Sequence, residues 1–199
     1  MADIKIEDIK KLKELSGAGL TDAKNALVEA KGNFDKALEV MRKKGLTKAE
    51  KRGDRETREG LIDSYVHDGR IGAIVEVNCE TSFVAKTDEF RDLVHKIAMQ
   101  VASMNPMYVS EADIPRVELG RVKKAAEEEL KSDKKPANVK KQIIEGKVKK
   151  AFEEKVLMSQ PYILDDSKTV AEFIKDTIAR TGENITVKQF RRIELGVSE

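Results

Sequence analysis

The residue best suited to covalent chemistry in this sequence is Cys79, because a thiol becomes a nucleophile when a base takes its proton. The chain's two histidines, His67 and His95, are the candidate bases. Cys79 ends the almost continuously apolar segment 71–79, however, and a cysteine in that setting is usually a small core residue. We therefore favour a structural role for Cys79. A single cysteine also excludes an internal disulfide framework, which indicates a reducing, cytoplasmic environment.

Metal, nucleotide and acid–base chemistry find little support in the sequence. One cysteine and two histidines that are not clustered do not make a zinc site. The segment GAGLTDAK (17–24) has two glycines of a dinucleotide fingerprint, but Asp22 stands at the third, and a helical pattern precedes it. No carboxylate pair lies in the kind of apolar surround that would prepare it for general-acid work. We predict that the protein is not an enzyme and binds no metal, nucleotide or other cofactor of its own.

Charge and hydropathy exclude further classes of protein. The chain has 199 residues, with 38 Lys and Arg against 36 Asp and Glu, and this balance argues against a polycation or an acidic tail. No apolar run approaches the roughly 20 residues that cross a bilayer. The first residues, MADIKIEDIKKLKEL, alternate charges with aliphatics, unlike a secretory signal. We expect a cytoplasmic protein without a membrane partner.

Residues 1–45 are predicted to form a module of three short helices. Apolar residues recur at a helical period in the first helix, and glycines at 17, 19 and 32 interrupt the pattern. Thr21 is the expected cap of the second helix and Asn33 that of the third. Residues 46–60 follow as a charged linker, helical or extended and exposed, because few of its side chains can be buried at low cost.

Residues 61–199 are predicted to form a mixed α+β core. Alternating apolar residues flank Asp68-Gly69, the pair most typical of a tight hairpin turn. The second arm, 71–79, is apolar at nearly every position, as expected of a central strand covered on both faces. Thr87 can cap the following helix, and the segment ITVKQFRRIELG (185–196) is predicted to be a closing strand beside the hairpin. The overall expectation is a helical module, a linker, and a small antiparallel sheet flanked by helices.

Residues of about 111–155 are predicted to form a charged helical hairpin with a break at 132–138. Twelve basic and seven acidic residues lie between Arg121 and Lys155, so two interpretations stay open. One is a solvated pair of helices, which we favour; the other is a patch that binds RNA or the ribosome. Only 5% of residues are aromatic, and few side chains are therefore available to stack on bases. We expect no nucleic-acid partner.

A binding segment is suggested where the apolar strand gives way to the next helix, at NCETSFV (78–84). Phe83 at the tip of a rigid loop would suit insertion into a partner's pocket. The alternative is that Phe83 and Val84 fold back onto the core, and periodicity alone favours this second interpretation.

Three separated motifs resemble the elongation factor Ts family. They are LKELSGAGLTDAKNALVEAKGNFDKALEVMRKKGL (12–46), EVNCETSFVAKTDEF (76–90) and the C-terminal stretch from EGKVKK to RRIELG (145–196). The resemblance spans essentially the whole chain in the right order, and the length is that of a short form without a long coiled-coil insertion. It implies a ubiquitin-associated-like module of three helices followed by an α+β core.

The resemblance also implies a function, that of a guanine-nucleotide exchange factor for elongation factor Tu. In this family a signature loop inserts an aromatic residue beside the partner's nucleotide pocket, displacing the elements that hold magnesium and phosphate so that GDP leaves and GTP binds. Carried over, the loop residues here are Thr81, Ser82, Phe83 and Val84. The residues of the N-terminal module expected to meet the partner are Lys10, Lys13, Leu20, Thr21 and Lys24. The GTPase domain and a further domain of elongation factor Tu are the expected contact surfaces.

One position departs from the family pattern, which usually has aspartate where this chain has Ser82. Serine can cap a turn but carries no charge, so we expect the wedging of Phe83 to carry most of the exchange. We also expect a homodimer, since a single core leaves the edge strands of its sheet unpaired.

Overall fold

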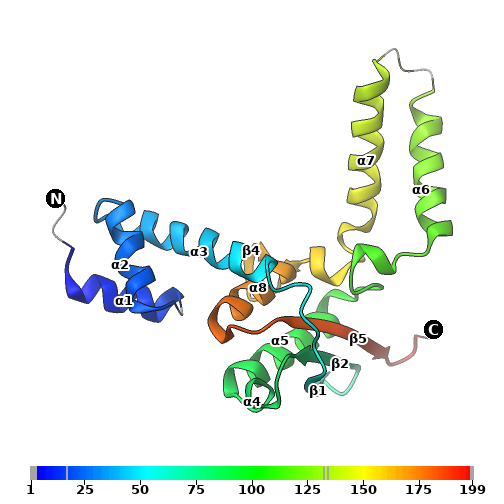
Figure 1. The fold of residues 1–199 in the computed structure, drawn as a ribbon. Coiled ribbons are helices and arrows are strands. Elements are labelled where there is room, and N and C mark those ends of the chain that lie inside the picture. Colours follow the sequence, from blue (N-terminus) through cyan, green and yellow to red (C-terminus); the bar gives the residue numbers. More distant parts are fainter. Residues whose placement is uncertain (1–3, 17, 132, 134, 198–199) are drawn as a thin grey trace. The chain divides into compact units, whose positions relative to one another are not determined.

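The computed structural model describes residues 4–16, 18–131, 133 and 135–197 (Figure 1). Gly17, Ser132 and Lys134, which fall in predicted breaks, lie outside the described residues. Helices and strands mix along the chain, and the predicted α+β class is confirmed. The chain divides into two compact units. The first comprises Met1–Asp63, Glu76–His95 and Glu172–Val187, and the second Ser64–Val75, Lys96–Ala171 and Lys188–Glu199.

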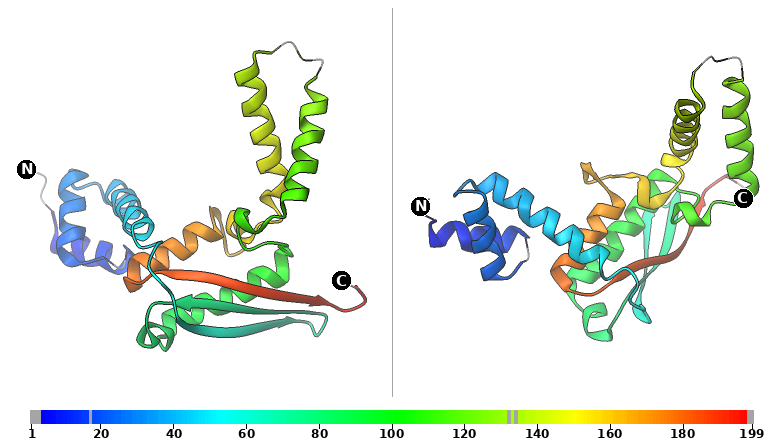
Figure 2. Two further views of the ribbon diagram at one scale, coloured as in Figure 1. Left: turned by 45° about the vertical axis from the view of Figure 1, so that its right-hand side comes forward. Right: turned by 45° about the horizontal axis from the view of Figure 1, so that its top comes forward.

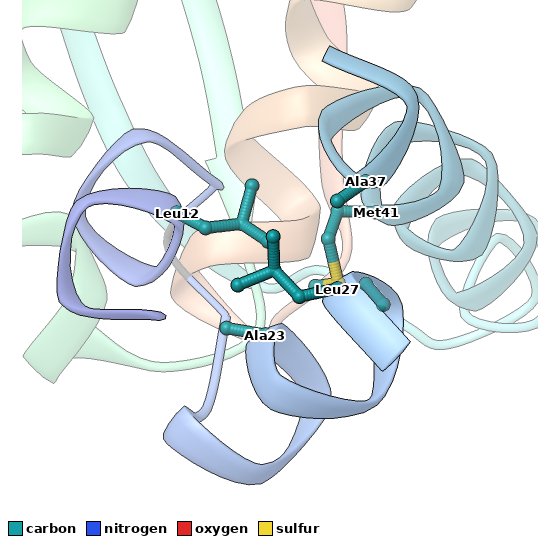
Figure 3. Packing of buried hydrophobic residues seen from close by; sticks show 6 residues of the cluster. Leu12, Ala23, Leu27, Ala37 and Met41 are labelled. Carbon is teal, nitrogen blue, oxygen red and sulfur yellow. The ribbon is translucent and has the colours of Figure 1, made fainter. Parts of the chain in front are cut away.

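The first unit begins with the three predicted helices, α1 (Ile6–Ser16), α2 (Leu20–Glu29) and α3 (Phe34–Glu50). Their facing sides meet in a small core of short and branched side chains (Figure 3). Leu12 and Leu27 fill its centre, while alanines on α2 and α3 let the helices approach closely. The members of this core are Leu12, Ala23, Ala26, Leu27, Ala37 and Met41.

Of the two N-caps predicted for these helices, one is observed and the other is not. Asn33 caps α3 as predicted, because its Oδ1 accepts the N–H of Lys36 at 3.0 Å. The prediction that Thr21 caps α2 is wrong. The cap is Gly19, whose carbonyl accepts the N–H of Ala23 at 3.0 Å, and Thr21 already lies inside the helix. Extended backbone at Gly19 lets α2 begin at Leu20, before the threonine can act as a cap.

The predicted linker 46–60 begins inside α3, which packs against α8 (Val170–Thr181). At this contact a Cβ on Gly45 would lie 3.2 Å from the Cβ of Ala179. Ala49 is buried, and Arg52 donates through Nη1 to the carbonyl of Ile178 at 3.2 Å. Ala49 and Arg52 are therefore packed against the fold, because small residues on α3 allow the two helices to approach closely. Residues 53–60 are exposed as predicted, apart from half-buried Thr57.

A three-stranded sheet has the order β1-β2-β5, with β1 at Glu59–His67, β2 at Ile71–Cys79 and β5 at Ile185–Glu194 (Figure 2). Asp68 and Gly69 have φ values of 49° and 67°, and the N–H of Arg70 donates to the carbonyl of His67. These positive angles match the twist of a tight hairpin. The predicted hairpin and the closing strand beside it are both confirmed.

The prediction that β2 is covered on both faces is wrong. Its buried residues alternate, at Ala73, Val75, Val77 and Cys79, whereas Ile74 between them is 47% exposed. A three-stranded sheet needs only one covered face to form a core, so the other face can keep apolar side chains in contact with solvent.

The second unit contains the predicted charged hairpin, formed by α6 (Arg116–Glu129) and α7 (Ala137–Glu153). A buried cluster of Ile114, Phe152 and Val156 lies at its base. A two-stranded antiparallel ribbon, β3 (Pro161–Tyr162) and β4 (Asp165–Thr169), follows. Among the described residues, no helix is both long enough and apolar enough to cross a bilayer.

Candidate functional site

The segment predicted as a binding loop is a single turn of helix, α4 (Ser82–Ala85), between β2 and α5 (Asp88–Met104). Thr81 is its N-cap, with extended backbone, and its side-chain oxygen accepts the N–H of Val84 at 3.4 Å. A threonine here can satisfy a helical N–H that would otherwise lack a partner. We call Thr81, Ser82, Phe83 and Val84 the 81–84 turn.

Neighbouring side chains of the 81–84 turn lie in opposite environments. Phe83 is 80% exposed, whereas Val84 is 6% exposed. Thr81 and Ser82 are also exposed. The interpretation that both apolar side chains fold back onto the core is therefore wrong for Phe83 and right for Val84. The turn keeps one apolar anchor inside and places an aromatic ring in solvent, an arrangement suited to a binding hot spot.

The helix that follows is capped as predicted by Thr87. Its Oγ1 accepts the N–H of Phe90 at 3.2 Å and donates to the carbonyl of Val84 at 2.8 Å. Phe90, Val94 and Ile97 of α5 are fully buried. The start of α5 is therefore hydrogen-bonded to the backbone of the turn, through Thr87 and Val84.

A carboxylate from a distant part of the chain holds the start of the turn. Glu183 accepts the backbone N–H of Thr81 at 3.0 Å through Oε2 and the hydroxyl of Thr81 at 2.6 Å through Oε1. Glu183 lies in the connection between α8 and β5, directly after Gly182, whose φ of 80° ends α8. Both oxygens of one side chain thus bind one residue of the turn.

A second set of contacts joins the same two segments. The backbone N–H of Asn184 donates to Oε1 of Glu80 at 2.6 Å, and Arg55 lies 3.4 Å from the same oxygen. The buried side-chain amide of Asn184 donates to the carbonyls of Gly53 and Arg55. Sequence reasoning missed these residues, because no local pattern joins segments about one hundred positions apart.

The buried side chain of Cys79 bonds the backbone of the same turn. Its Sγ donates to the carbonyl of Thr81 at 3.3 Å. Burial, with a further contribution from the negative charge of Glu183, raises the pKa of the thiol from 9.0 to about 11. His95 instead bonds Asp63 at 2.9 Å, and His67 bonds the Tyr65 hydroxyl at 3.0 Å. A protonated, buried thiol supports a structural role for Cys79.

The residues predicted on the N-terminal module lie on its two first helices. Lys10 and Lys13 belong to α1, and the remaining three to α2. All are exposed, and the apolar one, Leu20, is 56% exposed. They flank the connection between α1 and α2, whereas the 81–84 turn belongs to a separate element of the first unit. This set comprises Lys10, Lys13, Leu20, Thr21 and Lys24.

Other possible sites are few in the part of the chain that the structure describes. It contains no group of three or more His, Cys, Asp or Glu side chains that could hold a metal ion. The second unit has a groove of about 780 Å³ between α6 and α7. Its apolar floor includes Ile144 and Phe152, and its rim carries lysines and glutamates in equal number.

The 81–84 turn presents an exposed aromatic ring on anchored backbone, an arrangement common among residues that bind other proteins. The profile of the family described as "Elongation factor TS" matches residues 1–197. The chain therefore belongs to the elongation factor Ts family. It is a translation elongation factor, and the role of exchange factor follows from the family.

Individual relatives are similar over nearly the whole chain. Elongation factor Ts of Thermotoga sp. (strain RQ2) is 48% identical over 195 residues, which cover 98% of this chain and 97% of the relative. Elongation factor Ts of Fervidobacterium nodosum is 47% identical, covering 98% and 99%. Elongation factor Ts of Caldanaerobacter subterraneus subsp. tengcongensis is 45% identical, covering 97% of each chain.

Proposed function

We propose that the protein binds elongation factor Tu·GDP and promotes GDP release by inserting the 81–84 turn near the partner's magnesium and phosphate site. The observation that carries this proposal is the 80% exposure of Phe83 on a turn whose next residue, Val84, is buried. An exposed ring on anchored backbone can enter a pocket without first being ordered. The vacated pocket then takes up GTP.

No catalytic group is needed for this function. An exchange factor releases GDP by binding the nucleotide-free state of its partner more tightly than the GDP-bound state. Reciprocity requires that GDP weakens the binding of the factor by the same ratio. The contacts of Phe83 and its neighbours would thus offset those that the partner loses to magnesium and phosphate. The protein acts without a nucleotide site of its own.

The N-terminal module provides the second contact with elongation factor Tu. Exposed lysines at 10, 13 and 24 lie on the same two helices as exposed Leu20. Exposed lysines together with an exposed apolar residue suit an acidic surface with an apolar centre. We assign both this surface and the 81–84 turn to the GTPase domain, and a further domain of the partner completes the contact. The division into module (1–45), linker (46–60) and core (61–199) is part of the proposal.

The test is release of a fluorescent GDP analogue from elongation factor Tu. A substoichiometric amount of the protein should release all of the bound analogue, because each molecule acts repeatedly. Salt-dependent RNA binding, measured alongside, tests the alternative of an RNA- or ribosome-associated protein. Tight RNA binding without accelerated release would refute the exchange proposal.

Part of the positive charge on the helical hairpin is paired with carboxylates of the same hairpin. Lys147 forms an ion pair with Glu129, and Lys141 lies 3.9 Å from Glu145. Lysines paired with carboxylates are less available to phosphates, so this hairpin suits a solvated pair of helices better than an RNA surface. Elongation factor Tu is the partner that we propose, and both proteins would act in the cytoplasm, where translation takes place.

We propose that the second copy in a homodimer covers the open face of the sheet. Val66 and Ile74 are 63% and 47% exposed on two of its three strands. A Cβ on Gly72 would lie 4.0 Å from Val66, so Val66 lies on the same face as alternate residue Ile74. Apolar side chains on an uncovered sheet are a common site of self-association. Sedimentation equilibrium should give a dimer, and a stable monomer at micromolar concentration would contradict this.

A further inference from the structure

Two dipeptides far apart in the sequence, Glu80-Thr81 and Glu183-Asn184, are joined by reciprocal hydrogen bonds. The glutamate of each dipeptide accepts a backbone N–H from the other. Glu80 accepts the N–H of Asn184 at 2.6 Å, and Glu183 accepts the N–H of Thr81 at 3.0 Å. We call these four residues the carboxylate clasp. Each bond has a charged acceptor, and such bonds are about twice as strong as neutral ones.

The clasp reaches the helical turn through the hydroxyl of Thr81. A hydroxyl has one proton to donate, and here it goes to Oε1 of Glu183 at 2.6 Å. The lone pairs of the Thr81 hydroxyl oxygen remain free to accept the N–H of Val84 at 3.4 Å. Glu183 therefore orients the Thr81 hydroxyl oxygen that caps α4, in addition to holding the Thr81 backbone.

The other side of the clasp is fixed in the protein interior. Asn184 is 2% exposed, and its side-chain amide donates to the carbonyls of Gly53 at 3.2 Å and Arg55 at 2.8 Å. Thr81 is exposed, by contrast. The clasp thus joins a buried residue, Asn184, to the exposed start of the 81–84 turn.

We propose that Glu183 is a positioning residue for nucleotide exchange, which holds the 81–84 turn in the conformation that presents Phe83. This inference rests on the proposed function of the turn. Without the carboxylate, the start of the turn samples other conformations, and only a fraction of molecules present the ring correctly. The apparent affinity for elongation factor Tu·GDP falls by that fraction, whereas the complex, once formed, still contains Phe83.

The first experiment measures the clasp itself, in the free protein. Hydrogen exchange of the Thr81 amide is followed by NMR in the wild type, Glu183→Ala, Glu183→Gln and the control Glu56→Gln. Glu56 is an exposed carboxylate of the same unit that pairs with Arg58. We expect exchange at Thr81 about tenfold faster in Glu183→Ala. Glu183→Gln keeps one acceptor oxygen and should be intermediate, and Glu56→Gln should match the wild type. Amides of Val75 and Val77, two buried residues of β2, should not change in any variant.

The second experiment separates positioning from chemistry at the partner. Release of fluorescent GDP is measured over a range of elongation factor Tu·GDP concentrations. For Glu183→Ala we expect the half-saturating concentration to rise about tenfold, with a limiting rate within about twofold of the wild type. Glu183→Gln should recover part of the loss. A merely structural role would not produce this split, because unfolded molecules lower the limiting rate and leave the half-saturating concentration unchanged.

Several results would overturn the proposal. An unchanged Thr81 amide in Glu183→Ala would show that the clasp does not order the turn. A faster amide with unchanged release, or a lower limiting rate alone, would show that the order does not position Phe83. If Phe83→Ala itself released GDP like the wild type, the proposed function of the turn would fail as well. The amide measurement distinguishes these failures, because it does not depend on elongation factor Tu.

Discussion

Substitution of Phe83 by alanine is the sharpest test of the proposed function, because the ring contributes little to the fold. An aromatic side chain has roughly 200 Å² of surface, so 80% exposure leaves roughly 160 Å² for a partner to cover. The remaining roughly 40 Å² is worth about 1 kcal/mol of folding free energy at about 25 cal/mol per Å². Phe83→Ala should therefore lower the free energy of unfolding by no more than about 1 kcal/mol.

The same arithmetic bounds the loss of exchange. Covering roughly 160 Å² of apolar surface yields roughly 4 kcal/mol at most, before the costs of association are subtracted. Truncation of a hot-spot residue typically costs about 2 kcal/mol of binding free energy. Lost from the transition state, this amount lowers the rate about 30-fold. We expect a loss of at least this size in kcat/KM for GDP release, seen as a lower limiting rate.

Fluorescent-GDP release and urea unfolding should be measured on the same samples. Val117→Ala is the matched control, because Val117 is 77% exposed on α6, outside the proposed contacts. It should release GDP at the wild-type rate. If Phe83→Ala stays folded and keeps its exchange rate within about threefold, the ring is not a hot spot and the reasoning is refuted.

Three further predictions concern a glycine of β1, the buried thiol of β2 and the 81–84 turn. Gly60→Ala should destabilise the protein by about 2 kcal/mol in urea unfolding, because its Cβ would lie 2.3 Å from the carbonyl oxygen of Val77. Gly120→Ala, with open space in α6, should instead stabilise it by about 0.5 kcal/mol, and equal effects would contradict this. The raised pKa of Cys79 means that the unfolded thiol ionises first, so stability should fall by about 2 kcal/mol as pH rises from 9 to 11, and Cys79→Ala should remove this slope. Ser82→Asp should change GDP release by less than about threefold if wedging dominates, whereas a large gain would show that charge at this position matters more than we propose.

Local sequence patterns predicted most of the elements that carry the site. The Asp68-Gly69 pair determines the hairpin, since few other residues adopt two successive positive φ values. Asn33 and Thr87 cap helices at their predicted places. Thr21 misled the prediction, because a capping residue inside a helix cannot be distinguished by type from one at its start.

The site itself was only partly predictable from sequence. The segment 78–84 stood out by composition, yet periodicity favoured burial of both Phe83 and Val84. A turn of helix after β2 decides otherwise, because it places consecutive side chains about 100° apart, one toward the core and one toward solvent. Ile74 shows the same limit, since an apolar residue in a strand does not reveal whether its face is covered.

Family membership and the order of helices and strands are properties of the sequence alone, because they depend on short motifs and on local periodicity. Tertiary structure decided what holds the exposed ring in place. Glu183 and Asn184 contact Thr81 and Glu80 only because β5 pairs with β2, which brings the connection between α8 and β5 to the end of β2. Bonds between residues so far apart arise when packing brings two segments together, and no spacing rule in a single sequence encodes them.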